Sequence, residues 1–328
     1  MSREPDAVHP AAELLVVGDL NPDLVLSGDV VPRFGQAEQL LDDATLVIGG
    51  SAAITAHALA RLGRPVSLVA AVGDDAFGHT MLDRLTAADV DTRHVVVRDD
   101  LPTGLTVVLS RGEDRAMLTL PGAIASLAAD DVLAAVTDLE PAGLRHVHVS
   151  SYFLQPRLAR DLPLVLATAR DLGLSTSLDT NADPDGQWAG VDDVLPHLDL
   201  LLPNRAEAVA LGRDPDPRRA AAALAARGPL TVVKDGARGA LAVAPDGRLL
   251  EHAGTPADVV DATGAGDTFD AAFVAAWLDD ADLETALRRA VTAGRYSVAH
   301  IGGTAGQPAA ADLAPTAAAR PTLSGGHP

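Results

Sequence analysis

The sequence predicts an α/β fold, with a mostly parallel sheet covered by helices on both faces and a second, smaller β-sheet beside it. From residue 146 onward, short apolar runs alternate with helical stretches, which is typical of a parallel sheet. Two stretches, 22–47 and 103–120, hold only strand-like pieces and break this alternation. At 328 residues with 48% hydrophobic content, the chain is long enough to bury a large core.

The elements follow from the apolar pattern and from the turn residues that bound it. Short apolar runs predict strands at 13–20, 66–73, 146–153, 174–181, 198–204, 231–236 and 240–245. Helical patterns predict helices at 48–65, 74–90, 159–173, 205–212, 264–280 and 283–300. Ser51 is the predicted N-cap of the first helix, and the polar RGEDR stretch is the predicted turn of a hairpin at 103–120. We expect one domain over 13–305 with the small-sheet segments inserted, and tails at 1–12 and 306–328.

The composition argues against several partners and chemistries. A net charge of −20 disfavours nucleic-acid backbones and anionic membrane surfaces, and an aromatic content of 3% disfavours base-stacking platforms. The absence of cysteine excludes disulfides, thiolate catalysis and zinc–sulfur sites. No run of 18 apolar residues occurs and the N-terminal stretch lacks the apolar core of a signal peptide, so we expect a cytoplasmic protein.

The stretch DATGAGD, residues 261–267, carries the clearest chemical signal. Gly264 and Gly266 allow a sharp turn before a helix whose first N–H groups have no partner inside the helix. With the helix dipole, these N–H groups form a socket for an anion. Asp267 fits such a socket if the socket stabilises a moving phosphoryl group while Asp267 takes the proton from an attacking hydroxyl. A plain Gly-rich turn with an aspartate cap is the alternative interpretation.

This stretch resembles the C-terminal signature D-T-x-G-A-G-D of the ribokinase-like (PfkB) family of small-molecule kinases. Further pieces match the family in the same order, over about residues 13–304: IGGSAAITAHALARLG (48–63), AVGDDAFG (71–78), LPTG (101–104), LLPNRAEA (201–208) and VKDGARGA (233–240). The resemblance implies a Rossmann-like three-layer α/β sandwich, with the stretches at 22–47 and 103–120 forming a small β-sheet lid.

The resemblance also implies catalytic roles. Asp267 is the general base, and Gly264, Ala265 and Gly266 supply the anion hole. Asp261 matches the segment that, in many relatives, cradles a monovalent cation such as potassium, together with the loop at 298–303.

For the nucleotide, the resemblance implies that Asn204 binds phosphates and that Glu207 holds Mg²⁺ through water. Two residues three apart share one helix face, which suits a hydrated Mg²⁺, but Asn-x-x-Glu is also a good capping box. Lys234, Gly236 and Gly239 lie against the nucleotide in relatives, and Lys234 is expected to neutralise a phosphate.

For the acceptor, GDLNPD (18–23) resembles the end of the family's first strand, where Asn21 and Asp23 face the substrate. A carboxylate that accepts from two hydroxyls suits a polyol, although N-P-D is also a common turn. Gly49 and Gly50 are expected to let the substrate approach the backbone.

The chain departs from the family pattern at two positions. Ile54 replaces an Asn that helps to bind a sugar hydroxyl in relatives, and Val291 replaces an Asn that is common near the adenine. These departures leave the kinase chemistry intact and point to a less polar or larger acceptor. His146 and His148 alternate on one strand face, but without a third ligand they are expected to be structural rather than metal-binding.

We therefore expect an ATP- and Mg²⁺-dependent enzyme that phosphorylates a hydroxyl of a small sugar or sugar derivative. A nucleoside kinase of the same fold, in which Ile54 packs against a base, is the first alternative, and a non-catalytic sugar or nucleotide sensor is the second. Lids of this family often pair, which predicts a homodimer formed through the lid.

Overall fold

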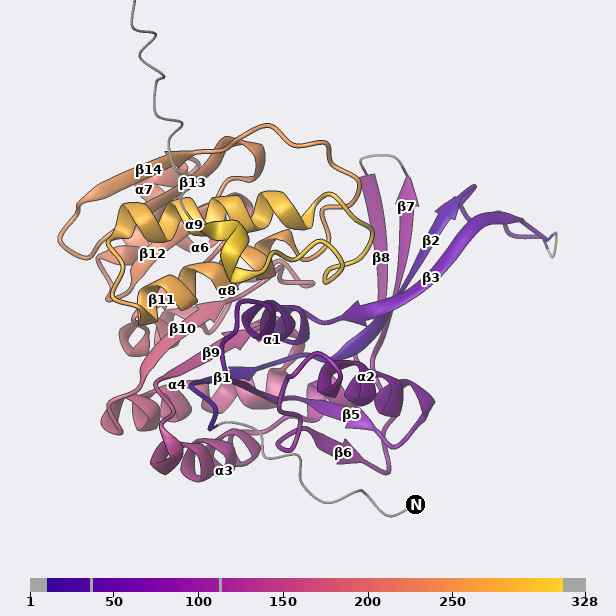
Figure 1. Cartoon of the computed structure of the whole chain (residues 1–328), viewed down its shortest axis with the longest axis horizontal. Coiled ribbons are helices and arrows are strands. Elements are labelled where there is room, and N and C mark those ends of the chain that lie inside the picture. Colours follow the sequence, from indigo (N-terminus) through magenta and orange to yellow (C-terminus); the bar gives the residue numbers. More distant parts are fainter. Residues whose placement is uncertain (1–10, 36–37, 112–113, 315–328) are drawn as a thin grey trace, which may run out of the picture.

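A computed structural model describes residues 11–35, 38–111 and 114–314, and its central feature is an eight-stranded sheet (Figure 1). The strand order is β14-β13-β12-β11-β10-β9-β1-β4, and all neighbours from β12 to β4 pair in parallel, whereas β13 and β14 pair antiparallel. These strands are β1 (Leu14–Val17), β4 (Val66–Val69), β9 (His146–Ser150), β10 (Ser175–Asp179), β11 (Leu200–Leu201), β12 (Leu230–Lys234), β13 (Gly239–Val243) and β14 (Leu249–Ala253).

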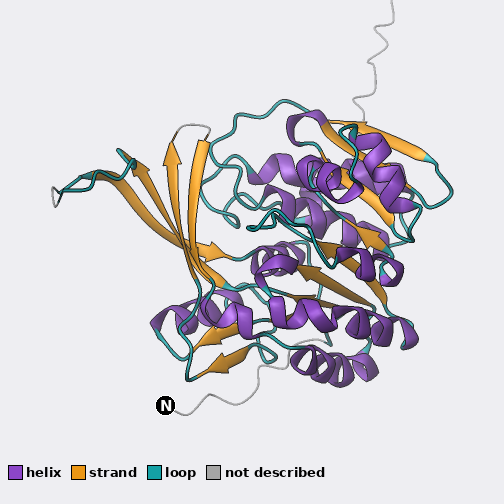
Figure 2. Ribbon diagram, turned by 180° about the vertical axis from the view of Figure 1, so that it is seen from behind, coloured by secondary structure: helices purple, strands orange, loops and turns teal. Residues whose placement is uncertain are grey.

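Helices cover both faces of this sheet, as Figure 2 shows from behind. In β1 the side chains of Leu14 and Val16 belong to one buried cluster and those of Leu15 and Val17 to another, because successive side chains of a strand point to opposite faces. The helices of the first cluster are α1 (Ser51–Arg61), α2 (Ala76–Thr86), α8 (Ala265–Leu278) and α9 (Leu283–Ser297). Those of the second are α3 (Ala129–Leu139), α4 (Pro156–Asp171), α5 (Val191–Val194), α6 (Arg205–Gly212) and α7 (Pro217–Ala225). The predicted three-layer sandwich is confirmed.

The second sheet projects from the body and forms the lid (Figures 1 and 2). Its strand order is β3-β2-β7-β8, made of β2 (Asn21–Gly28), β3 (Leu41–Gly49), β7 (Leu105–Arg111) and β8 (Asp114–Leu120). The two stretches that broke the α/β alternation therefore build one sheet, with β2 and β7 paired in parallel. The tip of the predicted hairpin, at 112–113, lies outside the described residues.

Several boundaries differ from the sequence-based prediction. The apolar run 66–73 forms two strands, β4 and β5 (Ala71–Gly73), and β5 pairs with β6 (Val96–Arg98) in a small third sheet. The sequence analysis predicted no helix at the positions of α3 and α7 and no strand at the position of β14. Of the expected tails, residues 1–10 and 315–328 lie outside the described residues. Residues 306–314 pack on the body, since Gln307 and Leu313 are buried.

Candidate active site

The residues of the predicted anion hole lie at the N-terminus of α8. Gly264 is its N-cap with φ 72°, a left-handed conformation in which a Cβ would lie 2.6 Å from the Cα of Gly303. The amide of Thr268 donates to the Gly264 carbonyl at 2.9 Å and makes the first i→i−4 bond of the helix. The amides of Gly266 and Asp267 precede that bond, and such amides are the usual donors for a bound anion.

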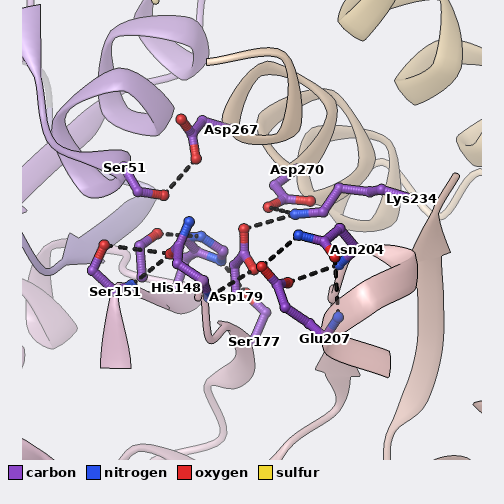
Figure 3. Close-up of polar contacts among 12 residues, drawn as sticks. Ser51, His148, Ser151, Ser177, Asp179, Asn204, Glu207, Lys234, Asp267 and Asp270 are labelled. Atoms are coloured by element: carbon purple, nitrogen blue, oxygen red, sulfur yellow. Dashed lines mark hydrogen bonds and ion pairs between the residues drawn. The ribbon is translucent and has the colours of Figure 1, made fainter. Parts of the chain in front are cut away.

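Asp267 lies in the first turn of α8 and accepts a hydrogen bond from the hydroxyl of Ser51, at the start of α1 (Figure 3). Burial raises the pKa of Asp267 to about 7, while the Ser51 bond acts to lower it. The prediction that Ser51 caps α1 is wrong. Gly50, with φ 87°, is the N-cap, so the Ser51 side chain is directed to Asp267 instead.

The expected acceptor residues lie at the base of the lid. The amide nitrogen Nδ2 of Asn21 lies 2.8 Å from Oδ1 of Asp23 and 3.3 Å from Oγ1 of Thr106 on the neighbouring strand β7. Both Asn21 and Asp23 are buried. Burial, together with the negative charge of Asp19, raises the pKa of Asp23 to about 7.

The paired glycines join this group to the catalytic base. A Cβ at Gly49 would lie 2.0 Å from Oδ1 of Asp23, so the carboxylate fills the space that a side chain would need. Gly49 is two residues before Ser51, which bonds to Asp267. Asp19 raises the pKa of both Asp23 and Asp267 through its charge. The structure therefore brings the base, the glycine pair and the acceptor residues together.

A cavity of about 260 Å³ opens on the other side of the α8 N-terminus. Its walls include the expected nucleotide residues Lys234, Gly236 and Gly239, and also the hole residues Ala265 and Gly266. Further lining residues are mostly apolar and include Val259, Phe269, Val291 and Val298. Ala265 and Gly266 of the expected hole line this cavity, whereas Asn21, Asp23, Gly49 and Gly50 do not.

Lys234 is the centre of a buried ion cluster (Figure 3). Its Nζ lies 2.7 Å from Oδ2 of Asp179, at the end of β10, and 2.7 Å from Oδ2 of Asp270, one helical turn after Asp267. Burial alone would lower the pKa of the ammonium, but the charges of Asp179 and Asp270 raise it above its usual range. Gly266 adjoins this cluster, since a Cβ built there would lie 3.5 Å from Nζ. The charge of Lys234 therefore lies close to the anion hole, but two carboxylates already share it.

Asn204 and Glu207 form the capping box that their spacing allowed. The side chain of Asn204 accepts from the amides of Ala206 and Glu207, and the Glu207 carboxylate accepts from the Asn204 amide at 2.8 Å. Burial raises the pKa of Glu207 to about 7, with the charge of Asp179 adding to this effect.

Among the described residues, no group of three or more His, Cys, Asp or Glu side chains could hold a metal directly. A cation near Glu207 would be favourable, because Glu207 is buried and the charge of Asp179 adds to the cost of ionising it. Mg²⁺ usually keeps several waters and binds to one or two carboxylates and substrate phosphates, so the site fits a water-mediated Mg²⁺ rather than a protein cage.

Asp261 joins the two loops expected to cradle a monovalent cation. Its Oδ1 accepts from the amide of Thr263 at 2.8 Å and from the Thr263 hydroxyl at 2.7 Å, and its Oδ2 accepts from the Gly302 amide at 2.9 Å. These bonds, with Gly264 packed on Gly303, hold the 261–264 and 298–303 segments side by side.

Ile54 and the histidine pair His146 and His148 are all buried. Ile54 is only 3% exposed and packs behind the anion hole, where a Cβ at Gly303 would lie 2.5 Å from its Cδ1. Its side chain therefore packs against the 298–303 loop. His146 and His148 are structural, because all four of their ring nitrogens bond to serine hydroxyls. Burial lowers their pKa values to about 3 and about 4.

Comparison with known proteins fits this geometry. Residues 11–310 match the model of the pfkB family of carbohydrate kinases. The chain belongs to this family. The pfkB chain is 29% identical over 306 residues to ribokinase of Bacillus subtilis, covering 90% of this chain and 96% of the relative. It is 31% identical over 300 residues to the ATP-dependent ribose-1-phosphate kinase of Halopiger xanaduensis, covering 86% and 92%. A solved structure of Arabidopsis thaliana ribokinase, complexed with ribose and ATP, superposes with a TM-score of 0.78 at 24% identity, covering 92% of this chain and 97% of that one.

Sequence reasoning missed five residues that the structure places in or beside the site: Asp19, Thr106, Arg115, Asp179 and Asp270. Asp19 stands inside the quoted GDLNPD stretch, and Asp179 ends a predicted strand in the way that site residues of parallel sheets often do. Asp270 was visible as an acid one helical turn after Asp267. Thr106 and Arg115 carry no such signal, because strand pairing alone brings them to the site.

Among the described residues, no helix has the length and apolarity needed to cross a bilayer.

Proposed function

We propose that this pfkB chain transfers the γ-phosphoryl group of ATP to a hydroxyl of a small sugar or sugar derivative. The observation that carries the proposal is the position of Asp267. It lies in the first turn of α8, where Ser51 links it to the glycine pair beside Asp23, and the preceding residues Ala265 and Gly266 line the cavity at Lys234 and Gly236.

In the proposed reaction, a carboxylate oxygen of Asp267 takes the proton of the acceptor hydroxyl. The hydroxyl oxygen then forms a bond to the γ-phosphorus as the bond from that phosphorus to the β–γ bridging oxygen breaks, and ADP leaves with the electron pair. The amides of Gly266 and Asp267 stabilise the charge that develops on the moving group. A base with a pKa near 7 suits this role, because it is substantially ionised at neutral pH and still binds the proton.

The acceptor is proposed from chemistry and from the relatives. Asn21 and Asp23 offer buried donors and acceptors that suit a polyol and disfavour an apolar molecule. The matches to ribokinase and to ribose-1-phosphate kinase favour a pentose or a pentose phosphate. The nucleoside alternative depends on Ile54 packing against a base, whereas its described neighbours are Gly264 and Gly303.

The cations would assist in different places. We propose that Mg²⁺, held through water near Glu207, neutralises the phosphates of ATP, and that Lys234 adds a fixed positive charge beside Gly266. The junction of Asp261 with the 298–303 loop suits a monovalent cation, and a titration with KCl against tetramethylammonium chloride tests whether potassium raises activity.

The test is an ADP-release assay with a panel of acceptors, comprising ribose, ribose 1-phosphate, fructose and adenosine, in which the phosphorylated product is identified by mass. We expect a sugar or sugar phosphate to give product with the native chain and essentially none with Asp267→Asn. Phosphorylation of adenosine alone would support the nucleoside kinase. Binding of a sugar with no product from any acceptor would support a sensor.

A further inference from the structure

Arg115, on β8, joins the lid to the loop before the anion hole. The register pairs Arg115 with Ser110 of β7, four residues after Thr106. Residues four apart on a strand share a face, and Thr106 pairs with Asp23 in β2, so Arg115 lies on the lid face that carries the acceptor residues.

The side chain of Arg115 crosses from the lid to the loop that begins the hole. Its Nη1 donates to Oγ1 of Thr263 at 2.6 Å and lies 3.6 Å from Oδ1 of Asp261. Thr263 immediately precedes Gly264, the N-cap of α8. A lid residue therefore touches the residue from which the anion hole starts, 148 positions away in the chain.

The contact continues into the body as a chain of hydrogen bonds. The Thr263 hydroxyl accepts from Arg115 and donates to Asp261, whose second oxygen accepts from the Gly302 amide. In this series the Thr263 hydroxyl both accepts and donates a hydrogen bond, and bonds linked in this way strengthen one another. The lid, the hole loop and the 298–303 loop are thus joined in one series.

The charge of Arg115 also acts on the acceptor side. Its positive charge lowers the pKa of both Asp23 and Asp261, which counters the burial that opposes ionisation of these acids. The guanidinium therefore contacts the hole loop and acts electrostatically on the Asp23 carboxylate as well.

We propose that Arg115 is a positioning residue that fastens the lid to the anion-hole loop and so keeps water from the phosphoryl group during transfer. This inference rests on the proposed function. When the fastening is intact, the alcohol is the only nucleophile that reaches the γ-phosphorus. When it is absent, water enters, and ATP is hydrolysed to ADP and phosphate without a phosphorylated acceptor.

Amide hydrogen exchange tests the fastening without any turnover. Arg115→Gln removes the charge and the bond to Thr263, and we expect exchange in both 114–120 and 261–265 to rise about two- to tenfold, as expected for the loss of one hydrogen bond. Arg111→Gln is the matched control, since Arg111 lies on the same lid hairpin, is exposed and points to the opposite face. Unchanged exchange in Arg115→Gln would overturn the proposal.

The ratio of ADP formed to phosphorylated acceptor tests the consequence. We expect a ratio near one for the native chain and for Arg111→Gln, and a ratio that rises about twofold or more for Arg115→Gln. Thr263→Val should raise the ratio in the same way and Thr263→Ser should not. The double variant Arg115→Gln/Thr263→Val should raise the ratio by less than the product of the two single effects, because both single variants remove the contact between Arg115 and Thr263.

The outcomes separate this inference from the proposed function. If the native chain phosphorylates no acceptor, the proposed function fails, and the exchange experiment still decides the fastening. Arg115→Gln could instead raise only the KM for the acceptor and leave amide exchange and the ratio of ADP to phosphorylated acceptor unchanged. Arg115 would then bind the acceptor, and the inference would be wrong. Melting temperatures control for misfolding, which is not expected for a side chain that is 37% exposed.

Discussion

The hydroxyl of Ser51 donates a hydrogen bond to Oδ1 of Asp267, a residue 216 positions later in the chain. This bond joins the first turns of α1 and α8. It follows from the glycine pair before α1, since Gly50 takes the capping position and leaves the serine hydroxyl free to reach the base. The serine that follows the glycine pair is thus hydrogen-bonded directly to the proposed base.

The first prediction concerns the pH dependence of this pair. Asp267 must be ionised to accept a proton, so kcat/KM should rise with pH through about 7, the value to which burial raises its pKa. The bond from Ser51 lowers that pKa, and Ser51→Ala should move the acid limb about half a unit to one unit higher. The charges of Asp19, Asp179 and Lys234 also act on Asp267 and stay in place in this variant. Ser51→Thr, which keeps the hydroxyl, is the control, and an unmoved limb in Ser51→Ala would contradict the prediction.

A second prediction concerns the acceptor. Asp23→Asn keeps the shape of the side chain and removes the charge, so the KM for the acceptor should rise about 10- to 100-fold, as expected for a hydrogen bond to a charged group. The KM for ATP should stay within about twofold, because Asp23 is on the lid side of the hole. Steady-state kinetics with each substrate varied in turn check this. An equal rise in both KM values would show that Asp23 acts on the whole site.

A third prediction concerns the nucleotide cavity. Val291 lines it from α9, and Val291→Trp should fill part of its volume of about 260 Å³. We expect the KM for ATP to rise about tenfold or more with little change in the KM for the acceptor. Val291→Ile is the conservative control. A normal KM for ATP in the tryptophan variant would place the nucleotide elsewhere.

A fourth prediction concerns stability. Lys234→Met leaves the buried carboxylates of Asp179 and Asp270 without their cation, so the free energy of unfolding should fall by about 3 kcal/mol or more. Asp270→Asn added to this variant should recover part of the loss, because it removes one of the two stranded charges. Urea unfolding of the native chain and the two variants checks this. Equal losses in the single and double variants would contradict the account of the cluster.

This cluster also changes how the role of Lys234 can be tested. If Lys234 neutralises a phosphate of ATP, as the family resemblance implies, its replacement should raise the KM for ATP. In the structure Lys234 has a structural role as well, so a raised KM in Lys234→Met has two causes and is informative only beside the unfolding data.

Much of the fold could be predicted because its signals are local. The apolar runs of β1, β9, β10 and β12 are bounded by turn residues, and α9 has the helical period, with Ala286, Leu287, Ala290 and Ala293 buried. The two strand-only stretches were correctly assigned to a separate sheet. The parallel pairing of β2 with β7 joins segments about 80 residues apart, and no local pattern encodes such a pairing.

The site divides in the same way. Asp267, Gly264 and Asp23 belong to compact motifs and lie together in the structure as expected. The surroundings of Ile54 could not be predicted, because a position in a motif does not show which parts of the chain the side chain packs against. Thr106 and Arg115 reach the site only through the register of the lid strands, which depends on tertiary structure.

The central claim is that Asp267 is the general base beside the anion hole, and Asp267→Asn tests it most directly. Asparagine keeps the shape of the side chain but cannot accept the proton. With the best acceptor from the panel, we predict that kcat falls about 10³-fold while the KM values for ATP and acceptor change less than about threefold. A variant that keeps more than about one tenth of the native kcat would contradict the claim.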